Sequence, residues 1–446
     1  MKANADSLRA PAKGPIVQLI RPFQAFARNE AAGGILLLLC AVAALFWANS
    51  AWGEGYARLW HTEMTVRIAG TAVGKDLHFW VNEALMAVFF FVVGLEIKRE
   101  LLVGELASAR QAALPIAAAL GGVVVPAAIY LGFNAGGPGA RGWGIPMATD
   151  IAFAIGAMAL LGERVPSGLK VFLTALAIVD DIVAVAVIAL FYTSGTAWGA
   201  LGLAAGCIVV LLAANRLGVR HPLPYALVGI ALWGAVLHSG IHATIAGVAL
   251  AFTIPARTQL RPREFLLHGQ AVLDHFERAV QGDRTVINDE EQQAAVEAME
   301  DACEKVQPPL YRLEQALHPW VTFFIMPLFA LANAGVRISG NLAESLSAPV
   351  TLGVTLGLVF GKPLGVTLAA WLAVRTGVAA LPQGTSWRHI HGAGWLAGIG
   401  FTMSLFVAGL AFAEGDLLMM AKLGILTGSL CAGAAGAALL RRGPVR

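Results

Sequence analysis

The chain is short of charge, since Asp, Glu, Lys and Arg together make up only 13% of its 446 residues. An ordinary soluble domain carries about 25%. Hydrophobic residues account for 57% of the chain. This composition places the protein in a lipid bilayer and makes a water-soluble globule a poor interpretation.

Cysteine is also scarce, which excludes two further kinds of protein. The four cysteines, Cys40, Cys207, Cys303 and Cys431, are too far apart for zinc-ligand spacing or for a redox pair. Three of them lie in apolar runs, where a thiol serves as a small apolar side chain. We expect neither a disulfide framework nor a bound cofactor.

A clustered positive charge is absent as well. The net charge is +3, and the basic residues are spread among loops, so we expect no nucleic-acid partner. Residues 1–32 carry several Lys and Arg but no apolar core with a cleavage site. We interpret this segment as an uncleaved cytoplasmic tail.

What the chain does have is a series of long apolar runs. A helix needs about 20 residues to cross the hydrocarbon core of a bilayer. Twelve runs approach that length: eight within residues 33–254 and four within 318–440. They span residues 33–49, 77–95, 112–133, 144–161, 169–192, 198–214, 225–236, 240–254, 320–334, 350–374, 392–413 and 418–440. The sequence predicts an all-α polytopic membrane protein of about twelve transmembrane helices.

The distribution of Lys and Arg orients these spans. With the N-terminus inside, 24 of the 31 basic residues fall in cytoplasmic segments and five fall outside. This is the positive-inside pattern. We expect both termini in the cytoplasm, the C-terminal tail being residues 441–446.

One segment outside the membrane alternates like a β-hairpin. Residues 64–68 and 71–73 flank Ala69 and Gly70 between the first two spans, on the outer face. The edge of such a hairpin would pair with a second copy, so we expect a homodimer formed through residues 64–73. The alternative is an irregular loop.

A polar segment interrupts the apolar pattern. Residues 257–309, within a cytoplasmic loop at 255–317, contain eleven acidic residues and two stretches of helical periodicity. The expected apolar faces are Val272, Phe276 and Val280, and then Val296, Met299, Cys303 and Val306. We predict a small helical hairpin, with disorder as the alternative.

Two adjacent acids, Asp180 and Asp181, lie in the middle of an otherwise apolar span. An Asp at the centre of a membrane helix costs about 2.5 to 3.5 kcal/mol on insertion scales, and two cost roughly twice that. A structural role does not explain such a cost. At about 100° per residue the two carboxylates point to different sides of the helix, so one can face water while the other faces a protein partner.

Lys362 is the expected partner, because it is the only Lys or Arg near the middle of any span. Pairing with a carboxylate would keep its ammonium group charged in lipid. The alternative is a salt bridge that only orders the bundle. The two interpretations are compatible, because a salt bridge that orders the bundle and breaks when the carboxylate takes a proton is also a switch.

Two spans are interrupted, one in each half of the protein. Gly144 and Pro146 lie in the first, followed by Thr149 and Asp150. The second, between residues 392 and 404, contains Gly398, Gly400 and Thr402. The neighbourhoods of the two spans run through the membrane in opposite directions, and corresponding interrupted segments in inverted repeats indicate a transporter's binding site.

Interrupted helices leave helix ends in the membrane, positive at N-termini and negative at C-termini. We expect Asp150 to balance the former and Lys362 the latter. Thr149 and Thr402 add hydroxyl oxygens, although each could instead bond its own helix backbone.

These oxygen ligands suit a hard cation rather than a transition metal. We therefore expect Na+ or Li+ as the substrate. Burial disfavours an ionised carboxylate, whereas a bound cation favours it, so protons and cations compete for the same oxygens. Such competition is sufficient for antiport if the site opens to one side at a time.

Other polar residues form weaker candidates. A cluster at a plausible cation entry combines Glu96, Arg99 and Glu100 at the end of the second span with Glu314 and His318 before the ninth. A solvated helix end is the alternative. His242 is a candidate pH reporter, against a hydrogen-bonded structural histidine.

Five motifs together resemble the NhaA family of sodium/proton antiporters. They are FFVVGLEIKRE at 90–100, ATDIAF at 148–153, ALAIVDD at 175–181, GKPLG at 361–365 and GIGFTMS at 398–404. The likeness covers nearly the whole chain. It is not independent of the interrupted-helix argument, because that rule rests partly on this same family.

The resemblance implies roles for the residues already named. Asp181 is similar to the family's principal cation carboxylate, and Asp180 to the neighbour that pairs with Lys362. Two broken, crossed helices would carry the site, balanced by Asp150 and Lys362. The cluster Glu96, Arg99, Glu100, Glu314 and His318 resembles the family's cytoplasmic pH-sensing groups. Transport would be electrogenic and activated at alkaline pH.

The resemblance also has gaps. The polar segment at 257–309 is longer than the family's usual loop, and it lies beside the pH-sensing region. The sequence therefore leaves the activation pH, the ion ratio and the Na+ over Li+ preference open.

Two other functions also use membrane acids. An intramembrane aspartyl protease needs carboxylates from two helices, whereas Asp180 and Asp181 are neighbours on one helix. Pairing Asp150 with Asp181 would be needed to supply them. A passive cation channel would not need a titrating pair coupled to Lys362. We expect a transporter and not an enzyme.

Overall fold

The fold is known from a computed structural model. It describes residues 30–68, 71–193, 195, 197–280, 289–337, 342–413 and 415–441. Most of the expected N-terminal tail, the turn at 69–70 and residues 442–446 lie outside this part. The chain divides into two compact units. Unit 1 comprises Met1–Arg58, Ala113–Asp180 and Pro327–Arg446, and unit 2 comprises Leu59–Ala112 and Asp181–Met326.

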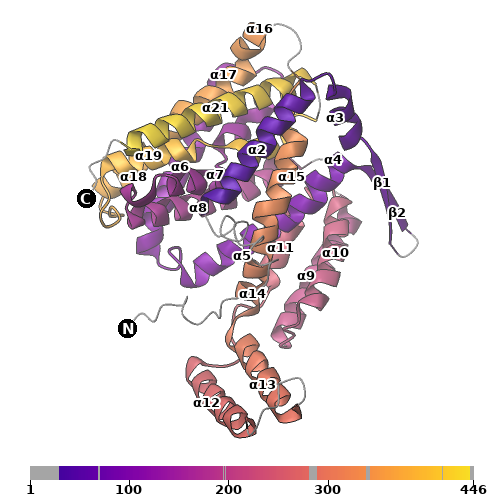
Figure 1. The fold of residues 1–446 in the computed structure, drawn as a ribbon. Helices are drawn as coiled ribbons and strands as arrows, with labels where there is room; N and C mark the ends of the chain where they lie inside the picture. The colour runs from indigo at the N-terminus through magenta and orange to yellow at the C-terminus, as the bar shows by residue number, and fades with distance from the viewer. Residues whose placement is uncertain are drawn as a thin grey trace. The chain divides into compact units, whose positions relative to one another are not determined.

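The regular elements among the described residues of unit 1 are all helices, and unit 1 contains both broken spans (Figure 1). Its elements include α2 (Glu30–Ala48), α6 (Ala109–Asn134), η3 (Ala140–Met147), α7 (Ile151–Ala159), η4 (Gly162–Arg164), α16 (Leu342–Ser347), α17 (Pro349–Leu356), η7 (Gly357–Gly361), α18 (Lys362–Arg375), α19 (Trp387–Ala397), α20 (Phe401–Ala411) and α21 (Asp416–Arg441). Four helices contain residues of both units: α3 (Gly53–Trp60), α6, α8 (Ser167–Phe191) and α15 (Met326–Asn333).

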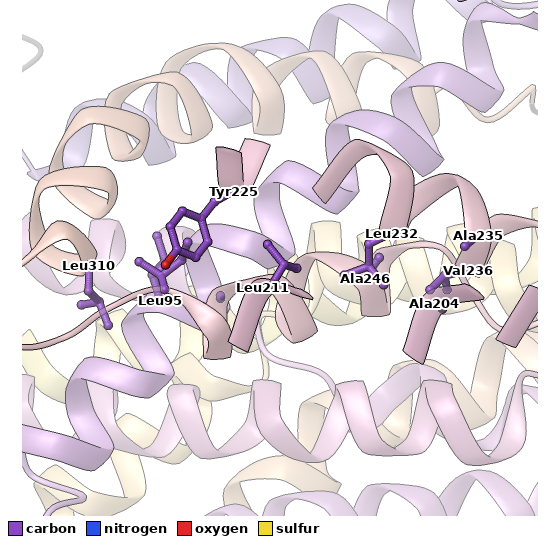
Figure 2. Packing of buried hydrophobic residues seen from close by; sticks show 11 residues of the cluster. Leu95, Ala204, Leu211, Tyr225, Leu232, Ala235, Val236, Ala246 and Leu310 are labelled. Atoms are coloured by element: carbon purple, nitrogen blue, oxygen red, sulfur yellow. The ribbon is translucent and has the colours of Figure 1, made fainter. Parts of the chain in front are cut away.

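Unit 2 contains the hairpin of β1 (Glu63–Ile68) and β2 (Thr71–Asp76) and a second set of helices. These are α4 (Leu77–Phe79), η2 (Trp80–Leu85), α5 (Met86–Val103), α9 (Trp198–Arg216), α10 (Pro222–Leu237), α11 (Thr244–Thr253), α12 (Pro262–Ala279), α13 (Glu290–Val306), α14 (Pro309–Trp320) and η6 (Val321–Ile325). Figure 2 shows its apolar core, in which Leu95, Leu211, Tyr225 and Leu232 come from α5, α9 and α10.

Seven helices among the described residues are long and apolar enough to span a membrane, or nine if each of two bent pairs is one span. Three expected spans do not meet that criterion alone. Two correspond to the shorter helices α10 and α11, and the third is divided between η3 and α7. Several helices extend beyond the expected runs, since α14, η6 and α15 together begin at Pro309 and not near residue 320. An apolar run identifies the part of a helix that lies in lipid, and it does not include the polar turns at the ends of that helix.

Glycine allows some helices of each unit to pack backbone to backbone. In unit 1 a Cβ at Gly121 would lie 2.2 Å from the carbonyl oxygen of Gly365 on α18. In unit 2 a Cβ at Gly247 on α11 would lie 2.2 Å from the carbonyl oxygen of Ala87 on α5. Small residues at such crossings are the usual means of close packing in membranes.

The predicted β-hairpin is present. Strands β1 and β2 are antiparallel, with Val66 opposite Val73 and Ile68 opposite Thr71. The second strand extends three residues beyond the expected end, to Asp76. Asp76 then caps α4 by accepting a hydrogen bond from the Phe79 N–H at 2.8 Å.

The polar segment forms the predicted helical hairpin, α12 and α13, which lie side by side (Figure 1). The expected apolar faces are right in part, since Val272, Phe276, Met299 and Val306 are half-buried but Cys303 is exposed. Val280 is 51% exposed and Val296 is 38% exposed, whereas Ala295 and Ala302 are buried. The two helices pack closely enough that small side chains fill the contact, and this turns the larger residues toward its edge.

Candidate functional site

The first broken span divides after Met147. The helix η3 ends there, Ala148 is extended, and α7 begins at Ile151 with Asp150 as its N-cap. Gly144 and Pro146, expected at the break, lie within η3 just before it. The break follows Pro146 closely, as expected where proline has removed a backbone donor.

The second broken span divides between α19 and α20, which meet at 46°. Gly398 and Gly400 lie in the break and Thr402 is the second residue of α20. A Cβ at Gly400 would lie 2.1 Å from Oγ of Ser404, and one at Gly398 would lie 2.5 Å from the carbonyl oxygen of Leu358. Both positions therefore require glycine.

Asp150 joins the two breaks. Its backbone N–H donates to the Ile399 carbonyl oxygen at 2.7 Å. Its Oδ1 accepts from the Phe153 N–H of α7 at 3.0 Å. Its Oδ2 accepts from the Thr402 N–H of α20 at 3.1 Å and from the Thr402 hydroxyl. One buried carboxylate thus satisfies the positive N-terminal ends of two half-helices.

The C-terminal ends of the other two half-helices are held by hydroxyl groups. Ser404 on α20 donates to the Ile145 carbonyl oxygen at 2.8 Å. The Thr149 hydroxyl lies 2.9 Å from the Ala397 carbonyl oxygen and 2.6 Å from Oδ2 of Asp180. A hydroxyl carries one hydrogen, so Thr149 can donate to only one of these acceptors at a time.

Asp180 and Lys362 meet in the interior of unit 1. Nζ of Lys362 lies 2.5 Å from Oδ2 of Asp180, with the side chains 0% and 1% exposed. The other oxygen, Oδ1 of Asp180, is buried and accepts no hydrogen bond in the described part of the chain.

Asp181 follows Asp180 in the middle of α8 and is also buried, at 2% exposure. Since successive residues of a helix are about 100° apart, its carboxylate leaves the helix in a different direction from that of Asp180.

A second group of charges lies in unit 2. Arg99 donates to Glu314 at 2.7 Å and to Glu100 at 3.2 Å. Glu96 interacts electrostatically with all three, and His318 with Arg99. The structure therefore brings the expected cluster together.

His242 belongs to a different contact in unit 2. Its Nε2 lies 3.2 Å from Glu83 and its Nδ1 lies 3.0 Å from the Thr244 hydroxyl. Both ring nitrogens are thus engaged, which is the geometry of the structural histidine given as the alternative.

An apolar groove of about 580 Å³ lies in unit 2 between α5, α10, α11 and α14. Trp80, Phe91 and Trp233 line it, and its lining includes no Asp, Glu, Lys or Arg. A groove without charge does not suit a cation.

Sequence reasoning missed two polar residues at the second break. Ser404 contacts the first broken span, as described above, and Ser429 on α21 accepts from the Phe401 N–H at 3.1 Å. Ser404 lies in a motif that was recognised, but serine is common in helices and carries little signal alone. Ser429 lies in a smooth apolar span and gives no signal.

Comparison with known proteins agrees with this geometry. A family model described as Na+/H+ antiporter 1 matches residues 24–440. A protein named Na(+)/H(+) antiporter NhaA from Oleidesulfovibrio alaskensis is 53% identical over 427 residues, covering 96% of this chain and 95% of that protein. One of the same name from Koribacter versatilis is 52% identical over 440 residues, covering 99% and 95%. The chain therefore belongs to the NhaA family of Na+/H+ antiporters.

Proposed function

We propose that this chain exchanges Na+ or Li+ for H+ through Asp180 and Asp181. The observation that carries the proposal is the state of Asp180: a buried carboxylate paired with Lys362, with one oxygen that accepts no hydrogen bond. The two relatives described above are both named as Na+/H+ antiporters. Family membership and site geometry support the same function.

Exchange follows from competition at these carboxylates. A proton and a cation each neutralise the same negative charge, so the binding of one displaces the other. Asp181 is proposed as the principal cation ligand, with Asp180 and the Thr149 hydroxyl as its neighbours. The site need only open to one side of the membrane at a time.

Lys362 would couple this competition to structure. When Asp180 is ionised the two groups form a buried ion pair, and protonation of Asp180 removes the charge that holds the lysine. The hydrogen of Thr149 would then be free to bond the Ala397 carbonyl oxygen and no longer Asp180. Both changes occur where α19 ends, which is suitable for switching a broken helix.

Asp150 is proposed to balance helix ends and to help shape the site. Both of its oxygens accept hydrogen bonds from the N-terminal ends of α7 and α20. A protease would need this carboxylate to share a proton with Asp181, and its engagement with helix ends argues against that. Lys362 remains proposed for the C-terminal ends, alongside the hydroxyl groups described above.

We further propose that the protein lies in a bacterial inner membrane with both termini in the cytoplasm. The excess of Lys and Arg in the cytoplasmic segments supports this orientation. It would place the β1–β2 hairpin outside, where residues 64–73 would form a homodimer. It would place Glu96, Arg99, Glu100, Glu314 and His318 inside as pH-sensing groups of an electrogenic exchanger, with His242 as a further candidate.

Everted membrane vesicles test the function directly. Addition of Na+ or Li+ should dissipate a preformed proton gradient with the wild type. It should have no effect with Asp181→Asn, because an amide cannot exchange a proton for a cation. The control is Asp416→Asn, which changes an exposed acid at the start of α21 and should keep full exchange.

Two outcomes would overturn the proposal. Full exchange in Asp181→Asn protein would remove the site assignment. A cation leak without counterflow of protons in the wild type would indicate a channel. Immunodetection of the variant in the membrane fraction separates lost exchange from lost protein.

A further inference from the structure

Two serines contact the second break, and the exchange scheme uses neither. Ser404 lies on α20 and is 0% exposed, and Ser429 lies on α21 and is 8% exposed. Ser404 donates its hydroxyl hydrogen to the Ile145 carbonyl oxygen of η3. Ser429 accepts a hydrogen from the Phe401 N–H, the first residue of α20. The start of α20 is therefore bonded to two different elements through serine hydroxyls.

The Ser429 contact satisfies one of the N–H groups that begin α20. The first N–H groups of any helix have no partner within the helix. Here the Phe401 N–H goes to Ser429 and the Thr402 N–H goes to Asp150. Without the serine oxygen, the Phe401 N–H would compete for the carboxylate of Asp150 or remain unsatisfied in the interior, and either would disturb the way Asp150 is held.

The Ser404 contact fixes the other side of the junction. Ile145 lies in the last turn of η3, where carbonyl groups lack helical partners. Its carbonyl is four residues before Thr149, so a bond to Ile145 also restrains the chain that leads to Thr149 and Asp150. Ser404 Oγ is packed directly against Gly400, and the Ser404 N–H donates to the Gly400 carbonyl oxygen at 2.8 Å.

We propose that Ser404 and Ser429 are positioning residues of the ion site. Their hydroxyls fix the start of α20 so that Thr402 presents its N–H and hydroxyl to Asp150, and Thr149 stays within reach of Asp180. The inference rests on the proposed function, since it assigns these residues a part in cation binding. Neither serine touches Asp180 or Asp181 through a hydrogen bond that the structure describes.

Na+ dependence of exchange in everted vesicles tests the inference. Ser429→Ala and Ser404→Ala should each raise the KM for Na+ about three- to tenfold, the factor that corresponds to one lost hydrogen bond. The maximal rate per inserted protein should change much less, because the carboxylates that exchange ions remain. Ser429→Thr keeps the acceptor oxygen and should restore the KM.

Thr351→Ala is the matched control. Thr351 is buried, and its hydroxyl lies 2.7 and 3.1 Å from the backbone carbonyl oxygens of Ser345 and Met420, neither of which belongs to a broken span. Loss of the Thr351 hydroxyl should lower stability, as loss of a buried serine hydroxyl also does, but should leave the KM for Na+ unchanged.

The outcomes separate the two proposals. Normal KM values in both serine variants, or an equal rise in Thr351→Ala, would overturn the positioning role while leaving exchange in place. No Na+-dependent proton movement in the wild type would instead overturn the function. If Ser404→Ala fails to insert, the comparison of Ser429→Ala with Ser429→Thr decides the matter.

Discussion

Lys362 and Asp180 form a buried ion pair from which neither partner can be removed cheaply. We expect Lys362→Ala to destabilise the protein by about 3–5 kcal/mol, because it leaves the Asp180 carboxylate charged and unpaired in the interior. The double variant Asp180→Asn, Lys362→Met should recover much of this stability, since it removes both charges. Thermal unfolding in detergent measures both effects.

In the double variant we expect the exchange rate to stay low although the thermal stability recovers. The double variant lacks the Asp180 charge, so we expect it to unfold near the wild-type temperature and yet to exchange poorly. A double variant as unstable as Lys362→Ala would mean that the pair contributes packing rather than charge balance.

For single residues, a candidate site residue is easier to recognise in the sequence the more free energy its burial in lipid costs. Asp150, Asp180 and Lys362 are conspicuous because a charged group in a span is expensive, and the structure brings them together with Thr149 and Thr402. Their roles in transport remain predictions. The roles of Ser404 and Ser429 could not be predicted from the sequence, because a serine hydroxyl can also bond the backbone of its own helix. Only the folded structure shows which group each hydroxyl contacts.

The crossing of α6 and α18 is an element-scale feature that places Lys362. Gly365 lies one turn after Lys362, and a Cβ there would lie 2.1 Å from the Gly121 carbonyl oxygen. We expect Gly365→Ala to force the helices apart, to destabilise the protein by about 1–3 kcal/mol through overpacking, and to lower exchange by displacing Lys362. Melting temperature and exchange rate measure the two effects.

Gly202→Ala on α9 is the control for that change. A Cβ at Gly202 meets nothing within 4 Å, so the substitution should be neutral or slightly stabilising through helix propensity. Equal behaviour of the two variants would show that the close approach at Gly365 is tolerated by relaxation.

Elements were predictable to the extent that lipid or periodicity defines them. The β-hairpin and the α12–α13 hairpin follow from alternation and helical period, and the spans follow from apolar runs. The ends of the helices could not be predicted from apolar runs, because the turns beyond the hydrocarbon core are polar. The exact faces of α12 and α13 could not be predicted either, because a helix-spaced set such as Val272, Phe276 and Val280 does not reveal how closely the partner helix approaches.

For the whole molecule, the sequence indicates how often the chain crosses the membrane but not how it divides. The two compact units interleave along the chain, and the boundary falls between Asp180 and Asp181 within one continuous helix. Periodicity and charge counts are local properties and cannot reveal a division made by contacts between distant segments. Interrupted spans in inverted halves can be recognised in the sequence, whereas the division into units is a property of the folded chain alone.

The α12–α13 hairpin can be removed at a point where the chain already closes. The N–H groups of Gln259 and Leu260 both donate to the Lys305 carbonyl oxygen, at 2.9 and 3.1 Å. Deleting residues 261–304 and joining Leu260 to Lys305 should therefore leave α11 and α14 in place. We expect the variant to insert and to exchange Na+ for H+, because the deleted residues include none of the proposed ion-site residues.

Its pH dependence is expected to shift. The hairpin contacts α14 through Glu304, which pairs with Arg312 at 2.7 Å, and α14 also carries Glu314 of the charged cluster. That exposed pair alone should contribute about 0–1 kcal/mol, so Glu304→Gln should move the profile much less than the deletion. Exchange measured against pH for the wild type and both variants gives the comparison. Coincident profiles for all three would show that the hairpin does not regulate transport, because α14 would then hold the cluster without its neighbour.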